Sequence, residues 1–315
     1  MTSKPKRSPL KYTDKMLNLA GASGRKPRVE KAATGAAALP SVFYEKCVVS
    51  FIDILGFKEV VEQRSADEVY QIMQLFKRHS DPEEEKIRSM DEARMTSRAW
   101  AQSVSDAIVR VRTADTQYRD GAFVRELLDL VHIQIELVNR GVLVRAGTTV
   151  GKVCVGIDGE HTFFGLGINR AYEIESKEAI FPRIVIDDAA LALHTSDESL
   201  RSEDNSLEDE LKIVNALVAE GEDGTRFIDY LAAVDEFDHP ALYLEFLQRH
   251  AELIRKGRAE GGDVRKRRKF EWLARYHNAR VRPMMAATLQ SEKRKTDFLA
   301  EYEADAEDYF KGIIV

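Results

Sequence analysis

The chain has 315 residues, of which 44% are hydrophobic and 32% are charged, and its formal net charge is -6 at pH 7. This length fits one large domain or two modest ones, and the composition excludes a fully disordered, collagen-like or membrane-embedded protein. No stretch approaches the ~20 apolar residues that cross a bilayer, so we expect no membrane partner. The negative net charge argues against a stable complex with nucleic acid.

The N-terminus and the cysteine content favour a cytoplasmic protein. The N-terminus is basic, but it lacks the apolar core of ~7–15 residues that a secretory signal contains. Cys47 and Cys154 are the only two cysteines. They exclude a disulfide scaffold and a four-cysteine zinc site, and they suit the reducing cytosol.

Residues 1–42 differ from the rest of the chain in composition. They carry nine Lys or Arg against two acidic residues, with little hydrophobic periodicity. We expect a flexible basic N-terminal arm with one short helix around residues 11–20. A disordered tail is the favoured interpretation, and a nucleic-acid contact is the alternative.

Residues 43–190 alternate strand and helix signals. A nearly continuous apolar run predicts a central strand at 47–52, and apolar residues at helical spacing predict a helix at 60–77. The highly charged stretch 80–95 is expected to be a solvated insertion with some helix. Residues 98–111 predict two strands that form a hairpin.

The second half of this segment continues the alternation. We expect a strongly amphipathic helix at 121–139, a strand at 142–150 with 151–155 as a hairpin arm, a helix at 169–175, and a final strand at 182–186. The predicted apolar face of the first helix consists of Leu127, Leu128, Val131, Ile135 and Val138.

The element order predicts an α+β or α/β sandwich around a mixed sheet with buried central strands. The catalytic domain is expected at 43–190 and a helical C-terminal extension at 191–315. The predicted helices of the extension are 207–219, 227–234, 241–258, 270–281 and 291–310. The five consecutive basic residues at 265–269 predict a solvated helix face, with nucleotide, partner or nucleic-acid contact as the alternative.

Two acidic residues interrupt apolar strands. Asp53 ends the first strand, and Asp106 lies at the tip of the hairpin in Ser-Val-Ser-Asp-Ala-Ile-Val. A carboxylate beside a buried strand is costly unless it is paired, and two of them on adjacent strands repel. A divalent cation with a preference for oxygen ligands, such as Mg²⁺ or Mn²⁺, removes that repulsion. The alternative is that each Asp caps a helix or turn.

The turn after Asp53 is a candidate phosphate site. Ile54-Leu55-Gly56-Phe57-Lys58 passes from strand to helix, and backbone N–H groups at a helix N-terminus can bind phosphate. Gly56 allows close approach of a ligand. An ordinary turn glycine is the alternative interpretation.

Four segments together resemble class III nucleotidyl cyclases. Phe-Ile-Asp-Ile-Leu-Gly-Phe resembles the first metal motif of that family, and Ser-Asp-Ala-Ile-Val resembles its second metal hairpin. Residues 144–151 resemble the following central strand, with its Arg-x-Gly-x-x-x-Gly pattern. Residues 164–171 resemble the segment that carries the transition-state Asn. The resemblance covers about residues 43 to 188, and it implies an α+β sandwich with a mixed, mostly antiparallel sheet.

A closer resemblance is to the bacterial pyrimidine cyclases of the Pycsar antiphage systems. The chain shares with them the Phe-x-Asp-Ile-Leu-Gly-Phe and Ser-Asp-x-Ile-Val patterns, Ala-Tyr-Glu after the Asn region, and a helical C-terminal extension. Residues 269–278 also resemble the tail of that group.

The resemblance implies a homodimer with active sites at the subunit interface. Asp53 and Asp106, with the backbone carbonyl of Ile54, would bind two Mn²⁺ or Mg²⁺ ions per site, and Asn169 would hold the ribose or the transition state. The residues that the resemblance assigns to the nucleotide are Phe51, Leu55, Gly56, Phe57, Gln102 and Arg183.

Departures from the family concern the base and the transition state. Gln102 and Leu166 occupy the positions that hold Lys and Asp in purine cyclases, and Leu166 cannot accept a hydrogen bond from adenine. Glu173 stands where the family has its transition-state Arg. Arg170 is a possible substitute, but the helical turn would point it elsewhere. Arg183 is either a triphosphate contact or a surface residue.

The resemblance therefore implies conversion of UTP, with CTP as the second choice, into a 3′,5′-cyclic monophosphate and pyrophosphate. The product would act as a second messenger in antiphage defence by activating a separate effector. The alternatives are a catalytically silent, cyclase-like dimerisation or nucleotide-binding module and a cyclase that uses a purine nucleotide. A diguanylate cyclase or polymerase-palm relative ranks lower, because the hairpin lacks a Gly-Gly-Asp-Glu-Phe pattern.

Overall fold

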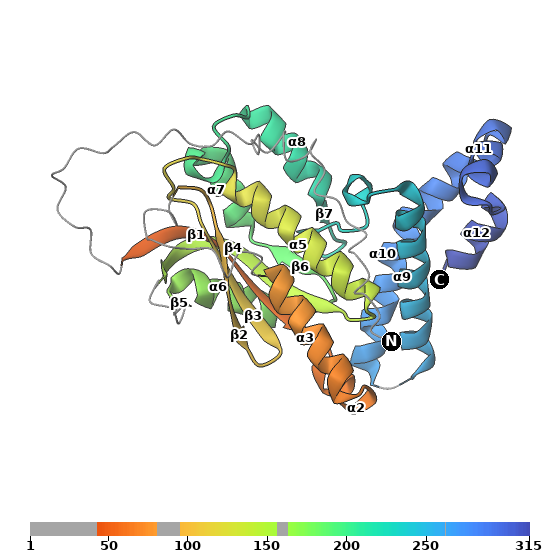
Figure 1. The fold of residues 1–315 in the computed structure, drawn as a ribbon, viewed down its shortest axis with the longest axis horizontal. Coiled ribbons are helices and arrows are strands. Elements are labelled where there is room, and N and C mark those ends of the chain that lie inside the picture. Colours follow the sequence, from red (N-terminus) through yellow and green to blue (C-terminus); the bar gives the residue numbers. More distant parts are fainter. Residues whose placement is uncertain (1–42, 81–94, 156–162, 262) are drawn as a thin grey trace, which may run out of the picture.

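A single mixed sheet forms the central layer of the protein (Figure 1). The computed structural model describes residues 43–80, 95–155, 163–261 and 263–315. The strands follow the order β2-β3-β1-β4-β6-β8-β7, with β5 paired to β4. Among the described strands, only β4 and β6 pair in parallel. The strands are β1 (Tyr44–Ile54), β2 (Ala99–Val104), β3 (Ala107–Thr113), β4 (Val144–Val155), β5 (Phe163–Phe164), β6 (Ile184–Ile186), β7 (Val218–Glu220) and β8 (Arg226–Ile228).

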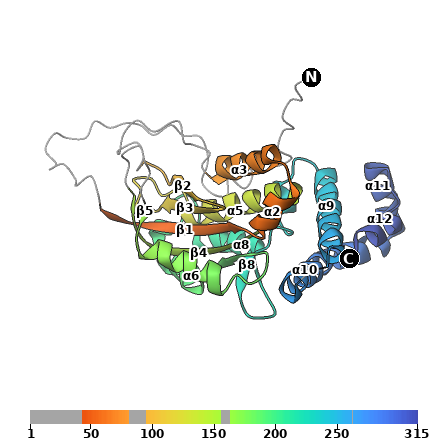
Figure 2. The same cartoon turned by 90° about the horizontal axis from the view of Figure 1, so that it is seen from below.

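Helices cover both faces of this sheet (Figure 2). One face carries α3 (Ala66–Ser80), which follows the short α2 (Phe57–Gln63), and α5 (Ala122–Asn139). The other face carries α6 (Leu166–Lys177), which packs on β1 and β4. The fold prediction is confirmed: the protein has a mixed α/β fold with an antiparallel-rich sheet and a helical C-terminal extension.

The remaining helices belong to the second half of the chain. The group α9 to α12 stands at one end of the sheet (Figure 1). Within the described residues, no helix is both long enough and apolar enough to cross a membrane. These helices are α7 (Asp188–Ser196), α8 (Leu207–Leu217), α9 (Pro240–Ala259), α10 (Val264–Leu289), α11 (Glu292–Tyr302) and α12 (Ala306–Ile313), with single 3₁₀ turns at Glu198–Leu200 and Val234–Glu236.

Strand β1 is central because it pairs on both edges and is covered on both faces. It is antiparallel to β3 on one side and to β4 on the other. Its apolar run, predicted as a central strand, is confirmed, and Cys47, Val48, Val49 and Ile52 are all 0% exposed.

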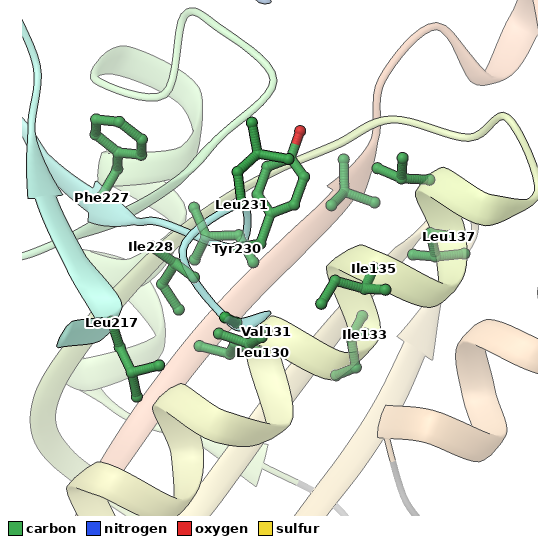
Figure 3. Packing of buried hydrophobic residues seen from close by; sticks show 14 of the residues in the cluster. Leu130, Val131, Ile133, Ile135, Leu137, Leu217, Phe227, Ile228, Tyr230 and Leu231 are labelled. Atoms are coloured by element: carbon green, nitrogen blue, oxygen red, sulfur yellow. The ribbon is translucent and has the colours of Figure 1, made fainter. Parts of the chain in front are cut away.

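The helix predicted at 121–139 is confirmed as α5, and it is buried on nearly all sides rather than on the predicted apolar face alone. Leu130 and Ile133, outside the predicted apolar face, are as buried as Leu127. The reason is that α5 lies between the sheet and the helices α3, α8 and α9. Figure 3 shows its side chains packed against Leu217, Phe227, Ile228, Tyr230 and Leu231 from the second half of the chain.

A buried ionic cluster fastens α5 to the sheet. Arg110 and Arg112 of β3 each place Nε within hydrogen-bond distance of the Glu126 carboxylate, at 3.0 and 3.1 Å. Both guanidinium groups also donate to Asp129, and Ser50 of β1 donates to Glu126 at 2.9 Å. Buried charges are costly unless they are paired, so this network specifies one register of α5 against the sheet.

The structure corrects two local predictions in residues 43–190 and confirms a third. The helix predicted at 60–77 is two helices, because Ser65 and Glu68 form a capping box that begins α3. The strand predicted at 142–150 continues to Val155 as one strand, and its hairpin partner is β5. The hairpin predicted at 98–111 is confirmed, with Ser105 at φ 58° in its turn. Most of the stretch 80–95, like residues 1–42, lies outside the described residues.

The prediction that residues 191–315 are almost wholly helical is wrong at β7 and β8. Strand β8 pairs with β6, so the sheet continues past residue 190. The segment predicted as a helix at 227–234 is part of β8 and a turn, and 291–310 is split between α11 and α12. The main core also contains residues from both sides of residue 190. A strand of three residues leaves too short a pattern to detect in the sequence.

A chain of hydrogen bonds links two buried histidines between α9 and α10. His277 Nε2 lies 3.0 Å from the Ile313 carbonyl oxygen, which can only accept, so this nitrogen carries the proton. His277 Nδ1 therefore accepts from His250 Nδ1 at 2.9 Å, and His250 Nε2 accepts from the Tyr230 hydroxyl at 2.7 Å. With both imidazoles neutral, each of their four ring nitrogens has a hydrogen-bond partner.

We expect this pair to make the protein less stable in acid. Burial lowers the pKa of His277 to about 4 and holds the pKa of His250 well below its usual value. Unfolded histidine has a pKa of about 6.5, so the unfolded chain binds more protons between about pH 6.5 and 4. The stability that the neutral histidines contribute is complete above about pH 6.5. It is lost as the pH falls, and the free energy of unfolding then changes by up to about 1.4 kcal/mol per pH unit for each histidine. In urea unfolding from pH 7.5 to 5, the free energy of unfolding should fall less steeply with pH for His277→Gln than for the wild type. Identical slopes would contradict this role.

Gly147 of β4 lets α6 approach the sheet closely. A Cβ atom there would lie 2.3 Å from the Ala171 carbonyl oxygen and 2.6 Å from the Ile174 Cβ.

Gly147→Ala should therefore destabilise the protein by about 1–3 kcal/mol in urea unfolding, as overpacking of a core does. Gly312→Ala is the matched control, because no described atom lies within 4 Å of its Cβ position and alanine is the better helix former. Equal stability of Gly147→Ala and the wild type would show that α6 shifts freely on the sheet.

Candidate functional site

Strand register brings Asp53 and Asp106 to the same end of the sheet. Asp53 stands opposite Ala107 in the β1–β3 ladder. The neighbouring Ile54 N–H donates to the backbone carbonyl of Asp106 at 3.3 Å. Both side chains are half-buried. Two residues 53 positions apart in sequence are thus neighbours, because one ends a central strand and the other occupies the adjacent hairpin turn.

Arg145 and Glu175 complete this cluster. Arg145 stands opposite Asp53 on β4, and its Nε donates to Asp53 Oδ2 at 3.1 Å. The same nitrogen lies 2.7 Å from Oε1 of Glu175, which comes from α6 and is 3% exposed. Among the described side chains, Arg145 is thus the cation that pairs with both the Asp53 and the Glu175 carboxylate.

The electrostatics of the cluster favour a further positive charge. Burial raises the pKa of Asp53, the hydrogen bond and charge of Arg145 oppose that rise, and the negative charge of Asp106 adds to it. Burial likewise raises the pKa of Glu175, Arg145 lowers it, and the charges of Asp53 and Asp106 raise it. One arginine thus does not fully compensate the buried negative charge.

The donor chemistry of this corner fits Mg²⁺ or Mn²⁺. Asp53 and Asp106 supply carboxylate oxygens and Ile54 a backbone carbonyl, which are the oxygen ligands that these cations prefer. Within the described residues, no group of three or more His, Cys, Asp or Glu side chains is arranged to hold a metal. A metal here would therefore rest on two carboxylates, backbone oxygen and ligands from outside the chain.

The β1–α2 turn offers fewer free amides than its sequence predicts. The Leu55 N–H donates to the Leu143 carbonyl at 2.8 Å, so it is not available to a phosphate. Gly56, at φ 73°, and Phe57 supply N–H groups of the first helical turn, which have no intrahelical acceptor. The Glu59 carboxylate lies over Gly56, close to where a Cβ would be, and a bound phosphate would have to displace it.

The other predicted nucleotide contacts are dispersed. Phe51 packs against Tyr172 of α6, with ring centroids 5.2 Å apart, and Phe57 packs on the main core. Gln102 is exposed on β2, and Leu166 is 79% exposed at the start of α6.

Asn169 lies apart from the two aspartates of its own chain. It is exposed near the start of α6, whereas Glu175, six residues later, reaches the Asp53 end of the sheet. At ~1.5 Å per residue, that separation is ~9 Å along the helix axis. Arg170, considered as a substitute for the transition-state Arg, pairs with Asp187 and Glu178.

Arg183 is not a surface residue, so that alternative is wrong. It is 1% exposed, and its two terminal nitrogens donate to the two oxygens of Asp223 at 3.0 and 2.6 Å. The guanidinium carbon lies 5.3–5.7 Å from the ring centroids of Phe181, Phe227 and Trp272. The pair lowers the pKa of Asp223 to about 2. Contact with a triphosphate would require Arg183 to leave this partner.

Sequence patterns did not identify Arg145 and Glu175 as site residues. Arg145 lies in a quoted strand motif, and its position opposite Asp53 depends on the β1–β4 register. Glu175 is one of several glutamates in a helix, and only the packing of α6 on β4 singles it out.

No protein-family model matches the chain, and no curated protein matches its sequence. The solved structures to which it is similar include the catalytic core of a rhodopsin-guanylyl cyclase with converted specificity in complex with ATPalphaS, at 16% identity over 59% of this chain and 97% of that chain, with a TM-score of 0.37. The monomeric guanylyl cyclase domain of the RhoGC fusion protein from the aquatic fungus Blastocladiella emersonii is 16% identical over 59% of this chain and 95% of that chain, with a TM-score of 0.36. A class III adenylyl cyclase-like ATP-binding protein from Pseudomonas aeruginosa is 14% identical over 55% of this chain and 41% of that chain, with a TM-score of 0.34. The function proposed below therefore rests on the geometry of the site and on the resemblance of the sequence motifs.

We expect Mn²⁺ to stabilise the protein through Asp53 and Asp106. A ligand that binds only the folded state adds about 2.7 kcal/mol at one hundred times its dissociation constant. Thermal unfolding should show a Mn²⁺-dependent rise in melting temperature for the wild type and a much smaller rise for Asp53→Asn and Asp106→Asn. Asp67→Asn, on the exposed face of α3, is the control and should respond like the wild type. An unchanged rise in both site variants would place any bound metal elsewhere.

Proposed function

We propose that the protein is a nucleotidyl cyclase that converts a nucleoside triphosphate into its 3′,5′-cyclic monophosphate and pyrophosphate. The observation that carries this proposal is the juxtaposition of Asp53 and Asp106 by the β1–β3 register. The resemblance of the segments around them to class III cyclases supports the same chemistry.

Asp53, Asp106 and the Ile54 carbonyl would hold Mn²⁺ or Mg²⁺. Two such ions would supply a lower pKa for the ribose 3′-hydroxyl and positive charge to neutralise the triphosphate. The 3′-hydroxyl would lose its proton to water, and its oxygen would form the new bond to the α-phosphorus as the bond to pyrophosphate breaks. The N–H groups of Gly56 and Phe57 would donate to phosphate oxygens once the Glu59 carboxylate is displaced.

A second copy of the chain is proposed as the partner. Asn169 cannot reach Asp53 of its own chain, so a site that uses both takes Asn169 from the other subunit. The exposed face around α6 and β5 carries large apolar side chains, as a dimer surface does. These are Phe164, Leu166 and Tyr172, at 48, 79 and 52% exposure.

We propose a pyrimidine substrate, UTP ahead of CTP. Leu166 cannot accept a hydrogen bond from adenine, and Gln102 offers both a donor and an acceptor to a smaller base. The cyclic product would serve as a second messenger for a separate effector in antiphage defence, in the cytoplasm. This part of the proposal rests on the resemblance to Pycsar cyclases.

A catalytically silent nucleotide-binding module is the second candidate. It is favoured by Arg145, which already occupies Asp53 Oδ2, and by Glu173, which stands where the family has its transition-state Arg. Such a module would bind nucleotide without turnover.

Incubation with each of the four nucleoside triphosphates and Mn²⁺, followed by mass spectrometry of the products, distinguishes these proposals. We expect cyclic UMP from the wild type and none from Asp53→Ala, because the metal loses a ligand. Equal or faster turnover of CTP would reverse the choice of base, and a preference for ATP or GTP would overturn the pyrimidine assignment. Nucleotide binding with no cyclic product would favour the silent module.

A further inference from the structure

A cavity of about 550 Å³ lies between the β1–α2 turn and the C-terminal helices. Its walls come from the β1–α2 turn, helix α2 and Arg64, from Gly141–Leu143 before β4, and from α9, α10 and the connection between them. Figure 1 shows α2 beside the lower ends of α9 and α10. The turn that follows Asp53 therefore opens onto the helical extension.

The cavity is lined by more cationic than acidic side chains. Five described lining residues are Lys or Arg and three are Asp or Glu. Lys266 and Lys256 pair with Glu260. Within the part of the chain that the structure describes, Arg265 and Lys269 form no ion pair within 4.0 Å. The cavity thus contains two cationic side chains, Arg265 and Lys269, that form no ion pair with the residues that the structure describes.

Packing on both sides fixes the position of Lys269. The next residue, Phe270, rests on the backbone of Gly257 in α9, where any Cβ would lie about 2.1 Å from the ring. Two residues after Phe270, Trp272 stacks on Phe181 with ring centroids 5.3 Å apart and packs edge-on against Phe227 of β8, with centroids 5.6 Å apart. The start of α10 is therefore held against both α9 and the sheet, with Lys269 turned into the cavity.

The surroundings of Lys269 connect the cavity with the paired aspartates. Partial burial and repulsion from Arg145 lower the pKa of Lys269, and the nearby charges of Glu59 and Asp53 oppose this. Lys269 lines the same cavity as Leu55 and Gly56, which follow Asp53 in the chain by two and three residues. A phosphate chain that extends from Asp53 across the turn would meet Lys269.

We propose that Lys269 of α10 is a phosphate-binding residue that neutralises the polyphosphate chain of a nucleotide held in this cavity. The inference rests on the proposed function for the identity of the nucleotide. The ligand class is a polyphosphate that the aspartate cluster anchors through divalent cations at one end. The C-terminal extension then supplies part of the active site of its own chain, and its five basic residues are not only a solvated helix face.

The test is binding of inorganic tripolyphosphate with Mg²⁺ to the full-length protein, measured by calorimetry. Lys269→Met should weaken binding about tenfold, as expected for loss of a charged hydrogen bond. Lys269→Arg should bind within about threefold of the wild type, because the charge is kept. Arg268→Met is the matched control: it removes one charge from the same helix outside the cavity, and binding should be unchanged. Lys269→Gln replaces Lys269→Met if the latter does not fold, as judged by circular dichroism.

Cyclase assays on the same variants separate this inference from the proposed function. If the wild type makes a cyclic nucleotide, Lys269→Met should raise the KM for the substrate about tenfold, and Arg268→Met should not. Tripolyphosphate binding that depends on Lys269, with no cyclic product from any nucleotide, would overturn the cyclase proposal and keep the phosphate site. Binding that is equal in Lys269→Met and the wild type, or absent from the wild type, would overturn the inference even if the protein is a cyclase.

Discussion

The pairing of β1 with β3 and β4 is the constraint on which the rest of the structure depends. It buries the apolar residues of β1 on both faces and brings Asp53 next to Asp106 and opposite Arg145. Two carboxylates this close repel, and the chain balances them with one arginine that Glu175 shares. The same strand geometry that makes the core stable thus produces a site that is short of positive charge. A site of this kind favours cations and the anionic ligands that come with them.

The opposite face of the sheet uses buried charge for a different purpose. Arg110 and Arg112 are fully paired with Glu126 and Asp129 of α5. Because removal of one partner would leave a buried charge uncompensated, α5 has one favourable position on the sheet. The two faces differ in charge balance: Arg110 and Arg112 are each paired with Glu126 and Asp129, whereas Arg145 alone is shared between Asp53 and Glu175.

The C-terminal helices are part of the same core. Strand β8 joins the sheet, and Trp272 of α10 packs on Phe181 and Phe227 around the buried Arg183. These contacts bring the basic start of α10 to the turn beside Asp53. A change in the position of α10 would therefore alter both the packing of the core and the positive charge near the turn after Asp53.

Elements with a local residue pattern can be predicted from the amino-acid sequence. Strand periodicity and turn chemistry act over a few residues, so they predict three features from sequence. These are the apolar run of β1, the turn at Ser105 and Asp106, and the carboxylates that interrupt both strands. Other contacts depend on the tertiary structure. Glu175 pairs with Arg145, and Arg183 packs among aromatic rings. The Leu143 carbonyl accepts from the Leu55 amide, and Lys269 lines the cavity. These contacts join segments far apart in the chain, and strand register and helix packing set them, so no local pattern encodes them.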